Sequence, residues 1–214
     1  MVFALKKKNK PFLVCLTGGV ASGKTVVSDV FKRQGVKIVD TDLIARQVVS
    51  LGSEGLIRLE HTFGKGVLDE GGALNRAFLR EKVFADNASR MKLNAVMHPL
   101  IHQEVVCQIS QSSADMIVVV IPLYAGQAEY LFFDRVCVVD VSESSQISRL
   151  QKRDGVDLLL ANSMVASQIN RKTRLKLADD VICNRKSLTD IMGGAMEMLD
   201  FYQNMRDCSI QSCQ

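Results

Sequence analysis

The stretch FLVCLTGGVASGKTVVSDVF, residues 12–31, constrains this chain more than any other feature. An apolar run, which predicts a buried strand, leads into the spacing G-x-x-x-x-G-K-T at residues 18–25, and a helical apolar pattern follows. Glycines permit backbone angles that other residues avoid, so successive N–H groups can curl round a phosphate. The stretch therefore predicts a strand, a phosphate-binding loop and a helix, with a nucleotide triphosphate as the anion.

The loop matches the P-loop pattern, in which each residue type has a task. Lys24 is expected to reach the β- and γ-phosphates, and the Thr25 hydroxyl is a hard oxygen ligand suited to Mg²⁺. A dinucleotide-binding fold would need G-x-G-x-x-G, which this loop lacks. The ATP contacts expected here are Gly19, Ala21, Ser22, Gly23, Lys24, Thr25 and Val26.

Five short apolar, β-branched runs recur along the chain, separated by stretches long enough for helices. Such runs are typical of a parallel sheet whose two faces are both covered, and therefore of a three-layer α/β domain. We accordingly predict a P-loop NTPase fold with a parallel five-stranded sheet. The runs are Phe12–Thr17, Val36–Val39, Met116–Ile121, Arg135–Val141 and Val181–Cys183.

Two intervals between the runs are too long for one crossover helix, which predicts insertions within a single domain of 214 residues. Both have helical apolar spacing, and the second is basic. We predict a core (about 11–50, 114–141 and 178–206), a helical substrate lobe (about 51–113) and a basic helical lid (about 142–177).

Two carboxylates, Asp40 and Asp42, follow the second apolar run, where the carboxyl edge of a parallel sheet usually binds ligands. One acid can orient metal-bound water while the other accepts a proton from an attacking hydroxyl. The alternative is that both cap the next helix. The third run ends without an acid, so indirect metal binding would fall to Asp40 or Asp42.

His98 and His102 are four residues apart, a spacing that can bind a metal on a helix. A third ligand is missing nearby, so metal binding is disfavoured. Pro99 predicts that a helix begins here, with His98 at its entry. Contact with a substrate phosphate and a structural role both stay open for His98.

Arg149 and Arg153 are the notable pair of the basic lid, because the (i, i+4) spacing points them the same way. Arginines above the γ-phosphate would neutralise charge that develops during phosphoryl transfer. The alternative is a solvated basic face without a ligand.

Composition excludes several classes of function. The net charge of +4 is mild, and the basic residues lack interleaved aromatics, which argues against nucleic-acid binding. No apolar run approaches the roughly 20 residues of a membrane span. The six cysteines contain no C-x-x-C pair, so we expect a reduced, cytoplasmic protein. A guanine-specifying N-K-x-D is also missing, and a small kinase remains.

Several segments resemble the dephospho-CoA kinase family, in the right order and over nearly the whole chain. They include LTGGVASGKT (16–25), VDTDLIARQVV (39–49), LNRAFLREKVFAD (74–86), LNAVMHPLIHQEV (93–105) and ADDVICN (178–184). The resemblance implies that ATP, with Mg²⁺, phosphorylates the ribose 3′-hydroxyl of dephospho-CoA to give coenzyme A and ADP, the last step of coenzyme A synthesis. It implies no nucleic-acid or membrane partner, and we expect a monomer or weak homo-oligomer. A related nucleoside or nucleotide kinase, or an ATP-binding regulator that has lost transfer, are the alternatives.

The resemblance also implies roles for individual residues. Lys24, Asp42 and Arg149 would be catalytic, and Arg149 and Asn184 would join the loop in binding ATP. The residues implied in substrate binding are Asp40, Asp42, Arg46, Asn75, Arg76 and His98.

The chain departs from the family pattern at three positions, and the change to Thr41 between the two acids is mild. Gly126 stands where the family commonly has a glutamate. Ala21 replaces a usual glycine of the loop, which we expect to be tolerated only with ordinary backbone angles.

Overall fold

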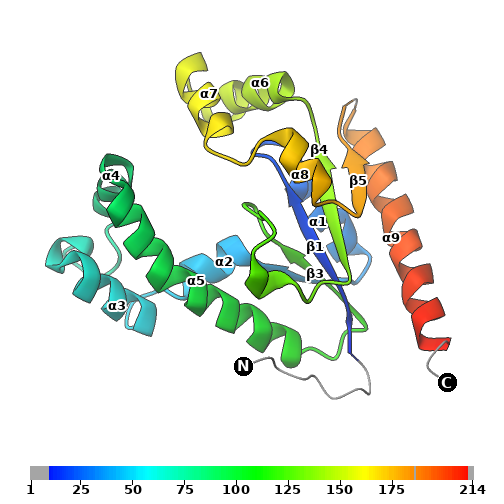
Figure 1. Ribbon diagram of the computed structural model, residues 1–214, viewed down its shortest axis with the longest axis horizontal. Helices are drawn as coiled ribbons and strands as arrows, with labels where there is room; N and C mark the ends of the chain where they lie inside the picture. Colours follow the sequence, from blue (N-terminus) through cyan, green and yellow to red (C-terminus); the bar gives the residue numbers. More distant parts are fainter. Residues whose placement is uncertain (1–9, 186, 212–214) are drawn as a thin grey trace. The chain divides into compact units, whose positions relative to one another are not determined.

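A single sheet with the strand order β2-β3-β1-β4-β5 lies at the centre of the first of two structural units (Figure 1). Each predicted run lies on a strand, and β1 pairs in parallel with β3 and β4, as does β4 with β5. The predicted α/β fold with a five-stranded sheet is confirmed. The strands are β1 (Phe12–Gly18), β2 (Lys37–Asp40), β3 (Met116–Val120), β4 (Arg135–Asp140) and β5 (Asp180–Cys183).

The structure, a computed structural model, describes residues 10–185 and 187–211. The first unit is Met1–Val39 with Ser112–Gln214, and the second is Asp40–Gln111. Each unit is described by itself. Within the described residues, no helix combines the length and apolarity that a bilayer span requires.

The core of the first unit forms where two helices pack on the sheet. Helix α1 (Lys24–Arg33) packs against α9 (Leu188–Gln211), and both contribute buried apolar side chains to the cluster around β1, β3 and β4. All five residues of β3 are buried, as expected for a strand covered on both faces.

Three more helices of the first unit follow β4 along the chain. They are α6 (Glu143–Asp154), α7 (Leu158–Ala166) and α8 (Arg171–Lys176), and Figure 1 shows α6 and α7 beyond the end of β4 and α8 beside that strand. A 3₁₀ turn, η2 (Ala128–Tyr130), lies between β3 and β4. The three helices occupy most of the predicted lid, whose functional name stays a prediction.

The second unit is helical and has its own apolar cluster. Its elements are α2 (Thr41–Gln47), α3 (Glu54–Phe63), η1 (Lys65–Val67), α4 (Arg76–Ala85) and α5 (Asn87–Ser110). Helices α2, α3 and α4 all pack against α5, and Val49, Leu59, Val67 and Leu79 are buried together. The predicted substrate lobe lies mostly within this unit, and its function also stays a prediction.

The prediction that a helix begins at Pro99 is wrong. Helix α5 begins at Asn87 and contains Pro99 in its interior. Asp86 caps the helix, because its carboxylate accepts hydrogen bonds from the N–H groups of Ala88 (2.9 Å) and Ser89 (2.9 Å). A proline in a long helix removes one internal hydrogen bond and need not end the helix when packing supports both sides.

Candidate active site

The phosphate loop connects β1, which ends at Gly18, to α1, which begins at Lys24. Gly23, the residue before the helix, has a φ of 102°, a left-handed angle that favours glycine. It gives α1 no side-chain cap. The start of the helix therefore keeps the Thr25 N–H and its positive dipole end available for an anion.

Several hydrogen-bond donors of the loop are unpaired within residues 10–185 and 187–211. Among the described residues, the N–H groups of Ala21, Gly23 and Thr25 meet no hydrogen-bond acceptor. In the same described part of the chain, the buried Ser22 Oγ also lacks a partner. Polar groups in such surroundings normally find partners, so the arrangement suits a ligand rich in acceptor oxygens.

Ala21 does not have the ordinary backbone angles on which its tolerance was expected to depend. Its φ is 55°, and it is the sole non-glycine residue with positive φ among the described residues. An L-residue in this region costs about 1–2 kcal/mol relative to a right-handed conformation. Bonds from the surroundings must therefore hold the loop in this shape.

Lys24 lies over the loop from the first position of α1. Its Nζ donates hydrogen bonds to the carbonyl oxygens of Gly18 (2.7 Å) and Gly19 (3.1 Å). Thr25 is exposed in the first turn of the helix, whereas Val26 is partly buried against the core. The ammonium and the hydroxyl are thus both at the uncapped helix start.

The structure brings Arg149 and Asn184 to the same loop. Arg149 Nη1 lies 3.3 Å from the Ala21 carbonyl oxygen and 3.4 Å from that of Ser22, and Nη2 donates to Asn184 O at 3.1 Å. The buried Asn184 side chain donates from Nδ2 to Ser22 O at 2.7 Å. These bonds tie α6 and the end of β5 to the loop.

Arg153 does not accompany Arg149, so the prediction of a shared direction is wrong. Its guanidinium bonds to the neighbouring Asp154 at 2.7 and 2.8 Å, and its side chain is 62% exposed. The adjacent carboxylate outweighs the helical spacing, because it offers a bidentate partner without any change in the backbone.

Sequence reasoning missed a buried ion pair next to the site. Asp140, the last residue of β4, is 3% exposed and accepts from Arg171 Nε (2.8 Å) and Nη2 (2.6 Å). These hydrogen bonds raise the pKa of Arg171. An acid that ends a buried apolar run is a signal that a cation must accompany it, and the basic residues of the lid could have been searched for that cation.

Two glutamines and a buried arginine were also missed. Gln146 and Gln168 bond to the loop residue Val20, and Arg174 donates to Ile169 O at 2.8 Å. Burial lowers the pKa of the Arg174 guanidinium, and Asp140 partly offsets this. The sequence carries no signal for the glutamines, because neutral amides do not stand out in a charge pattern.

In the second unit, Asp40 ends β2 and caps α2. Its carboxylate accepts from the N–H groups of Asp42 (2.8 Å) and Leu43 (3.4 Å). Asp42 lies in the first turn of α2 and Arg46 one turn later, and both are exposed. The capping alternative therefore holds for Asp40, the N-cap residue, whereas Asp42 is the acidic residue of the first turn.

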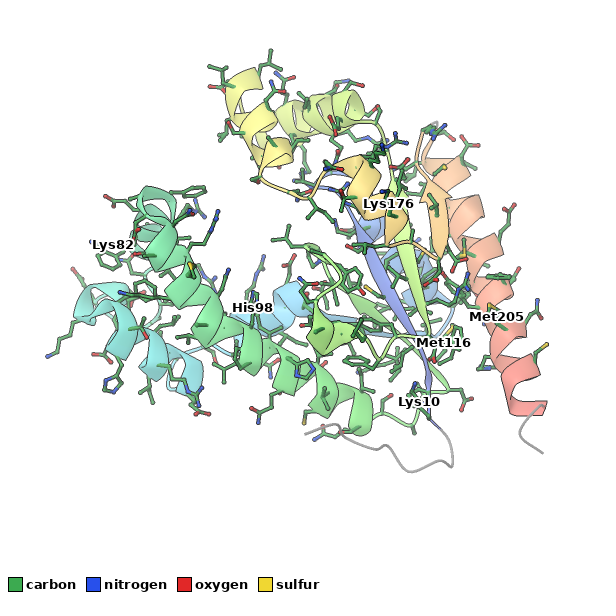
Figure 2. The ribbon with its side chains drawn as sticks, in the orientation of Figure 1. Lys10, Lys82, His98, Met116, Lys176 and Met205 are labelled. Carbon is green, nitrogen blue, oxygen red and sulfur yellow. The ribbon has the colours of Figure 1, made fainter. Side chains whose placement is uncertain are left out.

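Three further predicted substrate residues lie on α4 and α5. Asn75 caps α4 by accepting from Phe78 N at 3.0 Å, and Arg76, the first residue of that helix, is exposed. His98 is exposed in the interior of α5, where Figure 2 labels it. Among the described residues, no group of three or more His, Cys, Asp or Glu side chains could hold a metal ion.

Gly126, which replaces the family's common glutamate, has a φ of 75°. A Cβ added there would lie 3.2 Å from Leu177 Cδ2. The local backbone is therefore built around glycine, and a glutamate could not enter this conformation without strain.

Comparisons with known proteins agree with one another. The family model for dephospho-CoA kinase matches residues 12–190. The dephospho-CoA kinase of Aggregatibacter actinomycetemcomitans is 42% identical over 177 residues, which are 83% of this chain and 86% of that protein.

Two solved structures share the fold. A crystal structure from Thermus thermophilus has a TM-score of 0.78 at 23% identity and covers 88% of this chain and 96% of its own. The dephospho-CoA kinase from Campylobacter jejuni has a TM-score of 0.62 at 24% identity, over 90% of this chain and 98% of its own. From the family model and the sequence relative together, the chain belongs to the dephospho-CoA kinase family, whose members are ATP-dependent phosphotransferases.

Proposed function

We propose that this protein transfers the γ-phosphate of ATP to the ribose 3′-hydroxyl of dephospho-CoA, giving coenzyme A and ADP. The observation that carries the proposal is the uncapped start of α1 behind a loop with unpaired N–H groups, in a chain that matches the family over residues 12–190. Such a helix start binds the phosphates of a nucleotide through hydrogen bonds and the helix dipole.

The first unit is proposed to bind ATP. The loop N–H groups would surround the β-phosphate, and Lys24 would exchange its carbonyl acceptors at Gly18 and Gly19 for phosphate oxygens. Arg149 lies at the loop and can supply positive charge as the γ-phosphate leaves. We assign Asn184, which bonds to the loop, to the adenine side of the nucleotide.

The first unit also offers a ligand for Mg²⁺. Thr25 presents an exposed hydroxyl at the helix start, and no cluster of acids or histidines in the described part of the chain would bind the ion alone. This fits a magnesium ion held by Thr25, phosphate oxygens and water. When bound, the ion neutralises charge on the phosphates.

The second unit is proposed to bind dephospho-CoA. Asp42 is assigned the role of the base or orienting acid for the 3′-hydroxyl, since it is exposed in the first turn of α2. Arg46, Arg76 and His98 are exposed and suit the phosphates of the acceptor, and Asn75 is placed beside Arg76.

The test is ADP release in the presence of ATP and Mg²⁺, with and without dephospho-CoA, together with mass spectrometry of the product. We expect ADP release that depends on dephospho-CoA and a product heavier by one phosphate. Adenosine and AMP serve as competing acceptors, and phosphorylation of either in place of dephospho-CoA would support a nucleoside or nucleotide kinase. ATP binding without any transfer would support a regulator.

The cellular setting is part of the proposal. We expect a cytoplasmic enzyme that works as a monomer or weak homo-oligomer on small molecules. Sedimentation of the purified protein tests the oligomeric state, and a stable higher assembly would contradict the expectation of a monomer or weak homo-oligomer.

A further inference from the structure

Val20 is held at both its backbone N–H and its carbonyl by side chains from distant parts of the chain. Gln146 Nε2, on α6, donates to Val20 O at 2.7 Å, and Val20 N donates to Gln168 Oε1 at 2.9 Å. The Gln146 side chain is buried, with 2% of its surface exposed. A neutral amide buried at this depth is favourable only while its hydrogen bonds are made.

Gly19 shows that the chain is shaped around Gln146. A Cβ added at Gly19 would lie 2.0 Å from Gln146 Nε2, closer than any real contact. The phosphate-loop pattern itself does not require a glycine at this position, which is one of its variable residues. The close approach of Gln146 to the loop therefore explains why residue 19 is a glycine.

The bond from Gln146 has a consequence for the next peptide group. In a trans peptide, the C=O of one residue and the N–H of the next point in opposite directions. Holding Val20 O toward Gln146 turns the Ala21 N–H to the opposite side. Among the described residues this N–H meets no acceptor, and Ala21 has the strained φ of 55°.

We propose that Gln146 is a positioning residue that fixes the Val20–Ala21 peptide so that the Ala21 N–H can donate to a nucleotide phosphate. Without this donor, Ala21 relaxes toward negative φ, and the peptide turns a carbonyl oxygen to the phosphates, which repel it. Gln168 holds the Val20 N–H from the other side. The inference rests on the proposed function, because it assumes that the loop binds nucleotide phosphates.

Because different glutamines bond to the carbonyl and to the N–H of Val20, the same substitution at each glutamine should have a different effect. Gln146→Glu replaces the donor to Val20 O with a second acceptor, which breaks the bond. Gln168→Glu keeps an oxygen that accepts from Val20 N. Gln151→Glu makes the same change at an exposed position of α6 and serves as the matched control.

Three readouts separate positioning from general destabilisation. Calorimetry with Mg²⁺ and ADP should show affinity lowered about tenfold or more in Gln146→Glu, but changed less than about twofold in the other two variants. In ¹H–¹⁵N spectra, ADP should shift the Ala21 amide signal in the wild type and in Gln168→Glu but not in Gln146→Glu. The KM for dephospho-CoA should stay constant. In a merely destabilised protein, the binding of both the nucleotide and dephospho-CoA would change.

Gln146→Met, which keeps the side-chain length without a charge, replaces Gln146→Glu if that variant does not fold. The inference is overturned if Gln146→Met binds ADP like the wild type with its Ala21 shift intact, or if Gln168→Glu is as damaging as Gln146→Glu. A wild type whose loop amides do not respond to ADP overturns the proposed function itself. The two failures are therefore distinguishable.

Discussion

In the first unit, Arg149 and Asn184 donate hydrogen bonds to the carbonyl groups of the phosphate loop, and Asn184 is buried. In the second unit, Asp42, Arg46 and His98 are exposed. The loop is thus held in shape by side chains that are proposed to bind ATP, whereas these three proposed acceptor residues lie at the surface of their unit. We infer that the nucleotide site is largely preorganised and that the acceptor site depends more on its ligand.

The largest effect is expected for Lys24→Ala. Its Nζ carries the positive charge of the phosphate-loop pattern and lies 2.7 Å from Gly18 O. Loss of the charge that stabilises the transferring phosphate should lower kcat/KM for ATP by on the order of 10³-fold, measured by ADP release. Lys32→Ala, at an exposed position of the same helix, should leave activity unchanged. Wild-type rates in Lys24→Ala would contradict the assignment of the loop.

Asp42→Asn tests the second unit, in which Asp42, Arg46 and His98 are exposed. We expect turnover to fall by on the order of 10²-fold, because an amide cannot accept the hydroxyl proton, while ATP affinity stays nearly unchanged. The melting temperature should change by less than about 2 °C, since Asp42 is exposed. Glu81→Gln, which neutralises an exposed acid on α4, is the control. Unchanged turnover in Asp42→Asn would remove this residue from the reaction.

Asn184→Leu should instead damage stability and ATP binding together. The leucine keeps a similar volume but leaves the buried Ser22 carbonyl without the 2.7 Å hydrogen bond from Nδ2. Such a loss costs about 1–3 kcal/mol in the free energy of unfolding, measured by urea denaturation. The control is Asn162→Leu, because Asn162 donates to Leu158 O from an exposed position and should cost less than about 0.5 kcal/mol. Equal costs in the two variants would contradict the idea that the buried bond from Asn184 holds the loop of the first unit.

The sequence predicted what depends on local pattern. The apolar runs predicted all five strands, and the glycine spacing predicted the loop and the start of α1. The helix start predicted at Pro99 was wrong, because the local preference of proline for a helix start competed with the cap at Asp86 and with packing along α5. Local signals of this kind decide only where no other signal opposes them.

The supports of the loop were outside the reach of sequence reasoning. Gln146 and Gln168 are 126 and 148 residues away from Val20 along the chain. Their roles depend on where tertiary packing places two neutral side chains, which no periodicity or charge pattern reports. The left-handed angle of Ala21 follows from the same bonds and was missed for the same reason.

Ala21→Gly addresses that angle and should have the smallest effect. Glycine removes the cost of about 1–2 kcal/mol for left-handed φ but adds about 0.5–1 kcal/mol of entropy to the unfolded chain. We therefore expect the free energy of unfolding to rise by about 0.5 kcal/mol, measured by urea denaturation. A loop held by Gln146, Gln168, Arg149 and Asn184 should keep its ATP affinity.

Ala95→Gly, at an exposed position inside α5, gives the opposite sign from the same chemical change. Its backbone is already helical, so glycine should lower the free energy of unfolding by about 1 kcal/mol. If Ala21→Gly lowers stability as well, Ala21 does not store strain, and the loop needs no external bonds to hold its angle. If Ala21→Gly raises stability but weakens ATP binding, the alanine side chain itself limits the loop to its binding conformation, and preorganisation in the first unit comes partly from the loop itself.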